Sequence, residues 1–94
     1  MNTFNALVIS PDDSVAVVTE NIQEKGTVCY QINGQTVRLT SVTSVPVYHK
    51  VAIKNIHKGD NIYKYGQPIG RASQDIPAGT HVHTHNLVSV RETV

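Results

Sequence analysis

The sequence predicts an all-β domain built from short strands. Val, Ile, Leu, Thr and Tyr gather in short runs separated by clusters of turn-forming residues, the pattern of strands joined by tight turns. No segment of ten or more residues has the 3.6-residue apolar spacing of an amphipathic helix. Asn33-Gly34 stands between two of the apolar runs and predicts a type I′ hairpin, because both residue types tolerate positive φ.

The N-terminal half is expected to hold two strand pairs. Residues 4–9 and 14–19 flank the turn-forming residues 10–13, which predicts a strand, a tight turn and a strand. Residues 21–25 are expected to form at most one helical turn, too short to be an independent helix. The other expected elements are hairpin strands over 27–32 and 35–39 and a connection or edge over 40–44.

The C-terminal half is expected to alternate strands and bends. Pro46 confines the strand that includes it to a sheet edge or a strand entrance, because proline has no N–H to donate. The expected elements are strands over 45–53, 61–65 and 69–74, turns over 54–60 and 66–68, and a histidine-bearing strand after Gly79.

One eight-residue pattern recurs after twenty residues. Residues 53–60 and 73–80 share an Asn or Asp followed by Ile, and a Gly followed by Asp or Thr. Two copies are too few for a solenoid. We interpret them as paired bends of a folded-over β domain, in which Gly59 and Gly79 adopt a conformation that a Cβ would hinder.

Length and charge limit the possible functions. Residues 1–94 are expected to form one small domain, which buries only about two-thirds of its unfolded surface and has no room for both a core and a deep pocket. A partner would therefore supply much of any enzyme cavity. Eight Lys and Arg residues against seven Asp and Glu residues, scattered along the chain, argue against binding to nucleic acid or an anionic membrane.

The remaining composition favours a cytoplasmic protein. Cys29 is the single cysteine, so no internal disulfide can form, and its apolar neighbours favour a core position. No apolar stretch approaches the ~20 residues of a membrane-spanning helix, and the first residues lack the pattern of a signal peptide.

Three histidines at a spacing of two dominate the C-terminal part. In an extended strand His81, His83 and His85 would point to the same face. Each imidazole has a donor and an acceptor that need partners if buried, so the row is either a solvent-facing polar strip or a site. Two neighbouring imidazoles on such a strand can share one divalent ion, and we expect His83 and His85 to do so, with other ligands from a partner. Alternatively, the metal lies in the partner and the row acts as acid, base or hydrogen-bond donor.

The motif order over residues 45–86 resembles a known enzyme family. H-K-V-A, I-x-x-G-D, K-Y-G-x-x-I-G and D-I-x-x-G-x-H-V-H-x-H-N occur in this order from His49 to Asn86. This order is similar to the N-terminal SAF-type domain of the altronate and galactarate dehydratases and to the small subunit of sulfolactate sulfo-lyase. The H-V-H-x-H-N ending resembles altronate dehydratase and the sulfo-lyase more than galactarate dehydratase. Relatives typically have Gly where Tyr48 stands here.

The resemblance implies a β-clip fold and a β-elimination reaction. It implies a sugar-acid or sulfonated hydroxy-acid substrate, a divalent metal such as Fe2+ or Mn2+ held mainly by a large catalytic subunit, and a role for this chain as the small subunit or N-terminal domain. We expect the chain to be inactive alone, and it could form homo-oligomers without its partner. The alternative is a non-catalytic carbohydrate-binding SAF module.

Elimination requires a base, an acid or Lewis acid, and cations for the substrate's carboxylate. Each candidate residue also has a structural or solvated alternative, and His57 is expected to lie on the surface. The candidates are His49, His81, His83 and His85 for acid–base chemistry and Lys50, Lys64 and Arg71 for carboxylate binding.

Overall fold

The computed structural model describes residues 4–89 and confirms an all-β domain of short antiparallel strands. None of these residues belongs to a helix long and apolar enough to cross a membrane. The strands are β1 (Ala6–Leu7), β2 (Val15–Val18), β3 (Thr27–Ile32), β4 (Gln35–Thr40), β5 (Lys50–Ala52), β6 (Asn61–Lys64), β7 (Gln67–Ala72), β8 (His81–Val82) and β9 (Leu87–Ser89).

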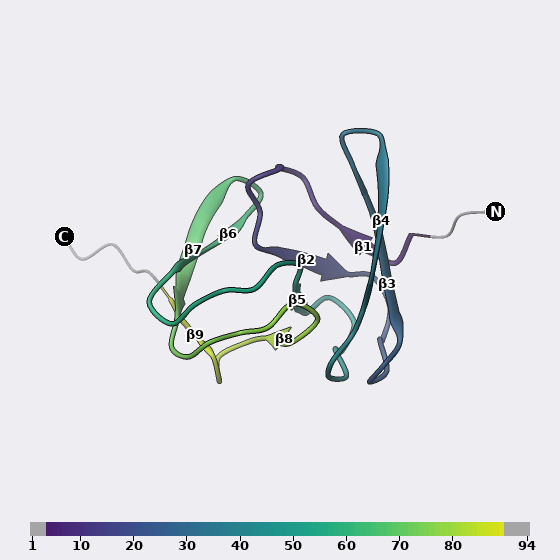
Figure 1. Ribbon diagram of the computed structural model, residues 1–94. Helices are drawn as coiled ribbons and strands as arrows, with labels where there is room; N and C mark the ends of the chain where they lie inside the picture. The colour runs from purple at the N-terminus through teal and green to yellow at the C-terminus, as the bar shows by residue number, and fades with distance from the viewer. Residues whose placement is uncertain (1–3, 90–94) are drawn as a thin grey trace.

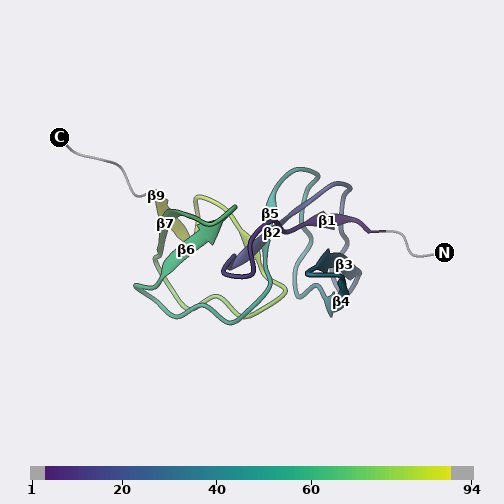
Figure 2. The ribbon, with the colours of Figure 1, turned by 90° about the horizontal axis from the view of Figure 1, so that it is seen from above.

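The strands form three small sheets in a row (Figures 1 and 2). The central sheet has the order β1-β2-β5-β8. The β3–β4 ribbon stands at the N-terminal end of the row, and β6-β7-β9 lies at the other end. The non-local pairing of β2 with β5 holds the two halves of the chain together, and β5 also pairs with β8.

Two hairpins have two-residue loops with positive φ at both positions. The Asn33-Gly34 loop has φ values of 52° and 76°, which confirms the type I′ hairpin between β3 and β4. Tyr65-Gly66 forms the second loop, with φ values of 56° and 78°. The predicted turn over 66–68 is therefore displaced: β7 begins at Gln67, and Pro68 lies inside it, next to an irregularity in the register of β6 and β7.

Four corners of the chain repeat one local structure. Each has a buried apolar residue followed three positions later by a residue with φ between 68° and 92°. The apolar residues pair as Ile22 with Val45 and Ile56 with Ile76, each pair exchanging two backbone hydrogen bonds of 2.7–2.8 Å. We call residues 21–26 with 44–49 the first clip, and residues 55–60 with 75–80 the second clip.

The sequence pattern identified the second clip and missed the first. The paired bends at Gly59 and Gly79 are confirmed, with φ values of 89° and 92°. The continuous strand expected over 45–53 is wrong, and residues 21–25 form a β-bridge and a turn with no helix. Lys25 and Tyr48 adopt the left-handed conformation, with φ values of 69° and 68°, which turns the chain at these points.

Two buried clusters form the core, and the β2–β5 pair contributes to both. Ala16, Val18 and Val51 pack in the cluster of the N-terminal half. Val15 and Ala52 pack in the other, together with the apolar residues of the second clip. The central strands are buried on both faces, which explains why β2 reads as a continuous apolar run. Cys29 is buried and unpaired, as expected.

Candidate functional site

The histidine-rich segment turns instead of continuing as a strand. β8 ends at Val82, and the next residues form a turn in which the N–H groups of Asn86 and Leu87 donate to the His83 carbonyl at 3.0 and 2.9 Å. The expectation that His81, His83 and His85 lie along one extended strand face is therefore wrong.

The buried side chain of Asn86 holds this turn. Its Oδ1 accepts from the His83 N–H at 3.0 Å, and its Nδ2 donates to the His81 carbonyl at 2.9 Å. The Asn86 side chain is only 1% exposed, and both of its polar atoms are satisfied. A strand cannot provide such local bonds, so the Asn86 amide accounts for the change of direction after Val82.

The pairing of β5 with β8 brings His49 into the same site. Val51 lies opposite His81, so in this antiparallel register His49 lies beside His83. The rings of His49 and His83 stack with centroids 4.5 Å apart. His49 Nδ1 and His81 Nε2 are 2.9 Å apart, so one of them carries the proton of a hydrogen bond. We call His49, His81 and His83 the histidine cluster.

His85 lies at the border of the histidine cluster. Its ring centroid is 5.4 Å from that of His81, at a tilt of 45°. The turn, rather than a strand, brings His85 there. Thus the three residues of the H-V-H-x-H motif do gather, and His49 joins them from a distant part of the sequence.

Burial and neighbouring charge lower the pKa of two members of the histidine cluster, His81 and His83. Burial, reinforced by His49, His85, His83 and Lys50, lowers the pKa of His81 to about 4. The pKa of His83 is also lowered, by desolvation and then by His49, Lys50 and His85. The lowered pKa favours the neutral imidazole in these two residues, the form that can accept a proton or ligate a metal.

The donor set of the histidine cluster fits a divalent transition metal. One ring nitrogen from each of the three residues lies within 4.8 Å of the others. Imidazole nitrogens suit Fe2+ better than Mn2+, which prefers oxygen ligands. The geometry groups His83 with His49 and His81, whereas the sequence paired it with His85.

The predicted carboxylate-binding residues separate into two groups. Lys50 is the first residue of β5 and directly follows His49. Burial, together with the charge of Lys64, lowers the pKa of Lys50, so Lys64 lies near it. The Nζ of Lys64 is 5.0 Å from the centroid of the Tyr65 ring. Arg71 is exposed on β7, opposite Val88 in a different sheet, and makes none of the contacts that join the cluster. His57 is exposed, as expected.

Two positioning residues were missed from the sequence. Asn86 closes the histidine turn, and its place at the end of the H-V-H-x-H-N motif is the sequence signal for it. Thr43 Oγ1 accepts from the His81 N–H at 2.9 Å. No local pattern could indicate this contact, because Thr43 lies in the connection between β4 and the first clip, far from His81 in the sequence.

Comparisons with known proteins identify the family of this domain. Residues 4–90 match the family described as "Altronate/galactarate dehydratase SAF domain". The match covers nearly all of the sequence and the whole histidine cluster. The chain therefore belongs to this family, which confirms the resemblance seen in its motifs.

The relatives differ in how much of their own length the chain covers. The chain is 46% identical over 74 residues to altronate dehydratase of Escherichia coli, covering 79% of the chain but 14% of that enzyme. It is 33% identical over 92 residues to subunit alpha of (2R)-sulfolactate sulfo-lyase of Chromohalobacter salexigens, covering 95% of the chain and 98% of that subunit. The corresponding Paracoccus pantotrophus subunit is 44% identical over 54 residues, 57% of the chain and 81% of the subunit.

Proposed function

We propose that this chain is the small subunit or N-terminal domain of an altronate dehydratase-like hydro-lyase and acts on a sugar acid together with a large catalytic subunit. The observation that carries the proposal is the histidine cluster with Lys50 beside it on the β5–β8 surface. Membership of the altronate/galactarate dehydratase SAF domain family supports the reaction class.

The proposed elimination needs one group to take a proton and another to assist the leaving group. A base removes the proton from the carbon next to the carboxylate, the C–H electron pair forms the double bond, and the C–O bond breaks to release water. His83 is the best candidate for the base, because its ring is accessible to solvent, whereas His81 Nε2 is engaged with His49. Lys50 and Lys64 would bind the substrate's carboxylate.

Alternatively, the histidine cluster would hold a divalent metal, with His83 as a ligand instead of the base. This chain would contribute three ligands, His49, His81 and His83. Three imidazoles suit Fe2+ better than Mn2+. When bound, the ion supplies a Lewis acid for the departing hydroxyl group. The hydrogen bonds from His81 N–H to Thr43 and from His83 N–H to Asn86 would then fix the backbone that carries two of the ligands.

A large partner is part of the proposal because the histidine cluster lies on an open surface of a small domain. The chain corresponds to 14% of the length of the Escherichia coli enzyme, and the name "subunit alpha" implies a further subunit in the sulfo-lyase. The chain alone is then catalytically incompetent. Free, buried Cys29 is compatible with a reducing compartment, and we place the protein in the cytoplasm.

A sulfo-lyase subunit is the second candidate function. It is favoured by the match over 98% of the Chromohalobacter salexigens subunit alpha. The same base and cations would serve, but a C–S bond would break and sulfite would leave. Assaying the complex with altronate and with sulfolactate, and measuring the keto-acid product and sulfite, separates the two candidates.

Replacing His83 by Ala in the complex with a large subunit tests the proposed role. Metal content and turnover are measured separately, with His57→Ala as the control because His57 is exposed in the second clip and outside the histidine cluster. Loss of metal identifies a ligand, and retained metal with turnover reduced at least about a hundredfold identifies an acid or base. Unchanged metal and turnover would reject a functional role for His83. Rapid dehydration of a sugar acid by the purified chain alone would reject the need for a partner.

A further inference from the structure

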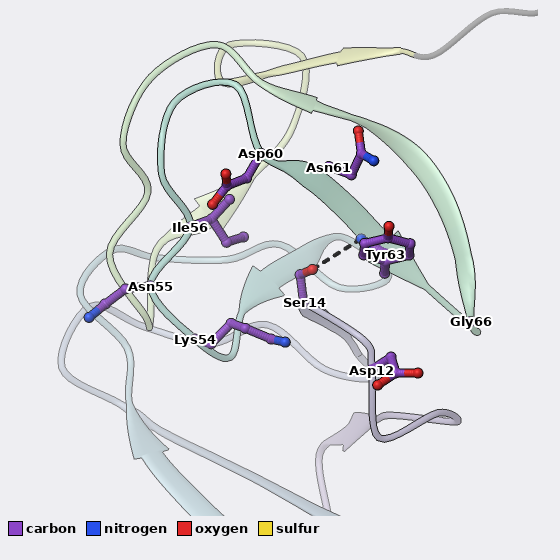
Figure 3. Close-up of a pocket in the computed structure, with 9 residues that line it drawn as sticks. All are labelled: Asp12, Ser14, Lys54, Asn55, Ile56, Asp60, Asn61, Tyr63 and Gly66. Atoms are coloured by element: carbon purple, nitrogen blue, oxygen red, sulfur yellow. Dashed lines mark hydrogen bonds between the residues drawn. The ribbon is translucent and has the colours of Figure 1, made fainter.

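A polar cleft of about 570 Å3 lies apart from the histidine cluster (Figure 3). Its walls come from three segments: the loop before β2, the corner after β5, and β6. No residue of the cleft belongs to the histidine cluster. The side chains relevant to binding are those of Asp12, Ser14, Lys54, Asp60, Asn61 and Tyr63.

Several polar groups of the cleft are unused by the fold. Within residues 4–89, the Asp12 carboxylate, the Lys54 ammonium and the Asn61 amide make no hydrogen bond or ion pair. Ser14 Oγ accepts from the Tyr63 N–H at 3.1 Å, which leaves its own hydrogen free to be donated (Figure 3). Unused donors and acceptors around one concave surface are what a polar ligand requires.

The fold fixes two walls of the cleft against each other through Asp13. Its Oδ2 accepts from the Ile9 and Ser10 N–H groups at 3.2 Å, and its Oδ1 accepts from the Gly66 N–H at 2.8 Å. Asp13 is 1% exposed, so these bonds lie in a dry environment. The loop that carries Asp12 is thereby tied to the β6–β7 hairpin, and the cleft is preformed.

The mixture of charges selects the class of ligand. Lys54 extends toward the segment that carries Ser14 and Asp12, and the Asp60 carboxylate lines another part of the cleft (Figure 3). Two carboxylates against one ammonium disfavour an anion, which would meet repulsion in excess of attraction. A hydroxyl group both donates and accepts, so a neutral polyhydroxylated molecule can bond to the carboxylates, the ammonium and the amide at once.

We propose that this cleft binds a neutral sugar or polyol, at a site separate from the histidine cluster. The volume suits a monosaccharide, since small-molecule sites commonly span about 300–1,000 Å3. The half-buried ring of Tyr63 provides apolar surface for the carbon skeleton. The proposal does not depend on the lyase function, because none of its residues takes part in the proposed elimination.

Heteronuclear NMR of the purified chain, titrated with glucose, galactose and mannitol, tests the proposal, with gluconate as the anionic comparison. We expect saturable shifts of the Asn61 and Tyr63 amides in the millimolar range. Asp12→Asn and Asn61→Ala should each weaken binding about fivefold, the effect of losing one hydrogen bond. Glu20→Gln, which removes the same charge from an exposed position outside the cleft, should leave affinity unchanged.

The outcomes separate this site from the proposed active site. Retention of neutral-sugar binding by His83→Ala supports the proposal whether or not that variant loses lyase activity in the complex. The spectrum of each variant reports its fold directly. Shifts confined to His81 and His83, tighter binding of gluconate than of the neutral compounds, or no saturable shift with any of them would overturn the proposal.

Discussion

The two clips share a backbone but differ in the residues that occupy its left-handed positions. In the second clip these are Gly59 and Gly79, for which positive φ carries no steric cost. In the first clip they are Lys25 and Tyr48, at a cost of roughly 1–2 kcal/mol each. Tyr48 is 74% exposed and directly precedes His49. The comparison shows that the chain accepts backbone strain at the corner that adjoins the histidine cluster.

The clips also differ in the side chains that link their two corners. In the second clip, Asn55 accepts from the Ala78 N–H at 2.9 Å and Asp75 accepts from the Lys58 N–H at 2.8 Å. In the first clip, Asn21 accepts from the Val47 N–H at 2.8 Å, and Ser44 occupies the fourth position. The second clip is therefore doubly linked, whereas the first has one link of this kind.

The largest expected effect is a difference between the two equivalent glycines of the second clip. A Cβ on Gly79 would lie 2.5 Å from the Thr40 carbonyl oxygen, whereas a Cβ on Gly59 would meet nothing within 4 Å. We expect Gly79→Ala to lower the free energy of unfolding by at least about 3 kcal/mol, because overpacking adds to the left-handed cost. Gly59→Ala should lower it by only about 1–2 kcal/mol.

Urea denaturation of both variants measures this difference. Equal losses would mean that the contact between Gly79 and the Thr40 carbonyl does not restrict the fold. A second contact also restricts Gly79 more than Gly59. The Val42 N–H donates to the Gly79 carbonyl at 2.8 Å, so the second clip packs closely on the connection that leads to the first clip.

The second expected effect concerns the histidine turn, which follows directly from the second clip. Asn86→Ala removes two bonds from a buried site and should cost about 2–3 kcal/mol of stability. It should also weaken Fe2+ binding about tenfold or more, because His81 and His83 lose their orientation. Asn86→Asp keeps the acceptor for the His83 N–H but loses the donor. Its stability and its Fe2+ affinity should lie between those of the unmodified chain and those of Asn86→Ala. Calorimetric titration with Fe2+ under reducing conditions makes the measurement, and unaltered affinity in Asn86→Ala would contradict the positioning role.

The fold was predictable wherever the sequence carries local conformational signals. Asn33-Gly34 specifies its turn through two residues that tolerate positive φ, and the Gly59 and Gly79 bends follow the same reasoning. The first clip escaped prediction because nothing in Lys25 or Tyr48 indicates a left-handed backbone. Tertiary contacts, such as the Tyr48 N–H donating to the Val18 carbonyl at 2.7 Å, impose it.

The candidate site was predictable in its residue types but not in its grouping. The spacing of His81 and His83 identified two members of the histidine cluster. The third, His49, enters through the long-range pairing of β5 with β8, which sequence spacing cannot reveal. Arg71 carries the right chemistry but lies in another sheet, because its strand pairs with β6 and β9 instead of β8.

A smaller effect distinguishes the two strained residues of the first clip. Lys25→Gly and Tyr48→Gly should each raise the free energy of unfolding by up to about 1 kcal/mol, since both relieve the left-handed cost. Under the proposed function, Tyr48→Gly should lower turnover of the complex with a large subunit about tenfold and Lys25→Gly should not, because Tyr48 is exposed beside His49. Equal turnover in the two variants would show that the strained residue Tyr48 does not contribute to activity.

The smallest expected effect is a gain from supplying the missing link of the first clip. By analogy with the other three corners, the residue at position 44 faces the Glu24 N–H, which has no hydrogen-bond partner within residues 4–89. Asn is long enough to accept from this group, as Asn21, Asn55 and Asp75 do at their own corners.

We expect Ser44→Asn to raise the free energy of unfolding by about 0.5–1 kcal/mol, a typical net value for one hydrogen bond at a partly exposed site. The reverse change, Asn21→Ser, should lower it by a similar amount. Urea denaturation of the two variants, singly and combined, checks whether the effects add, as they should if each link closes its own half of the clip. A loss of stability in Ser44→Asn would mean that the fourth corner departs from the geometry of the other three, and the equivalence of the two clips would then hold for the backbone alone.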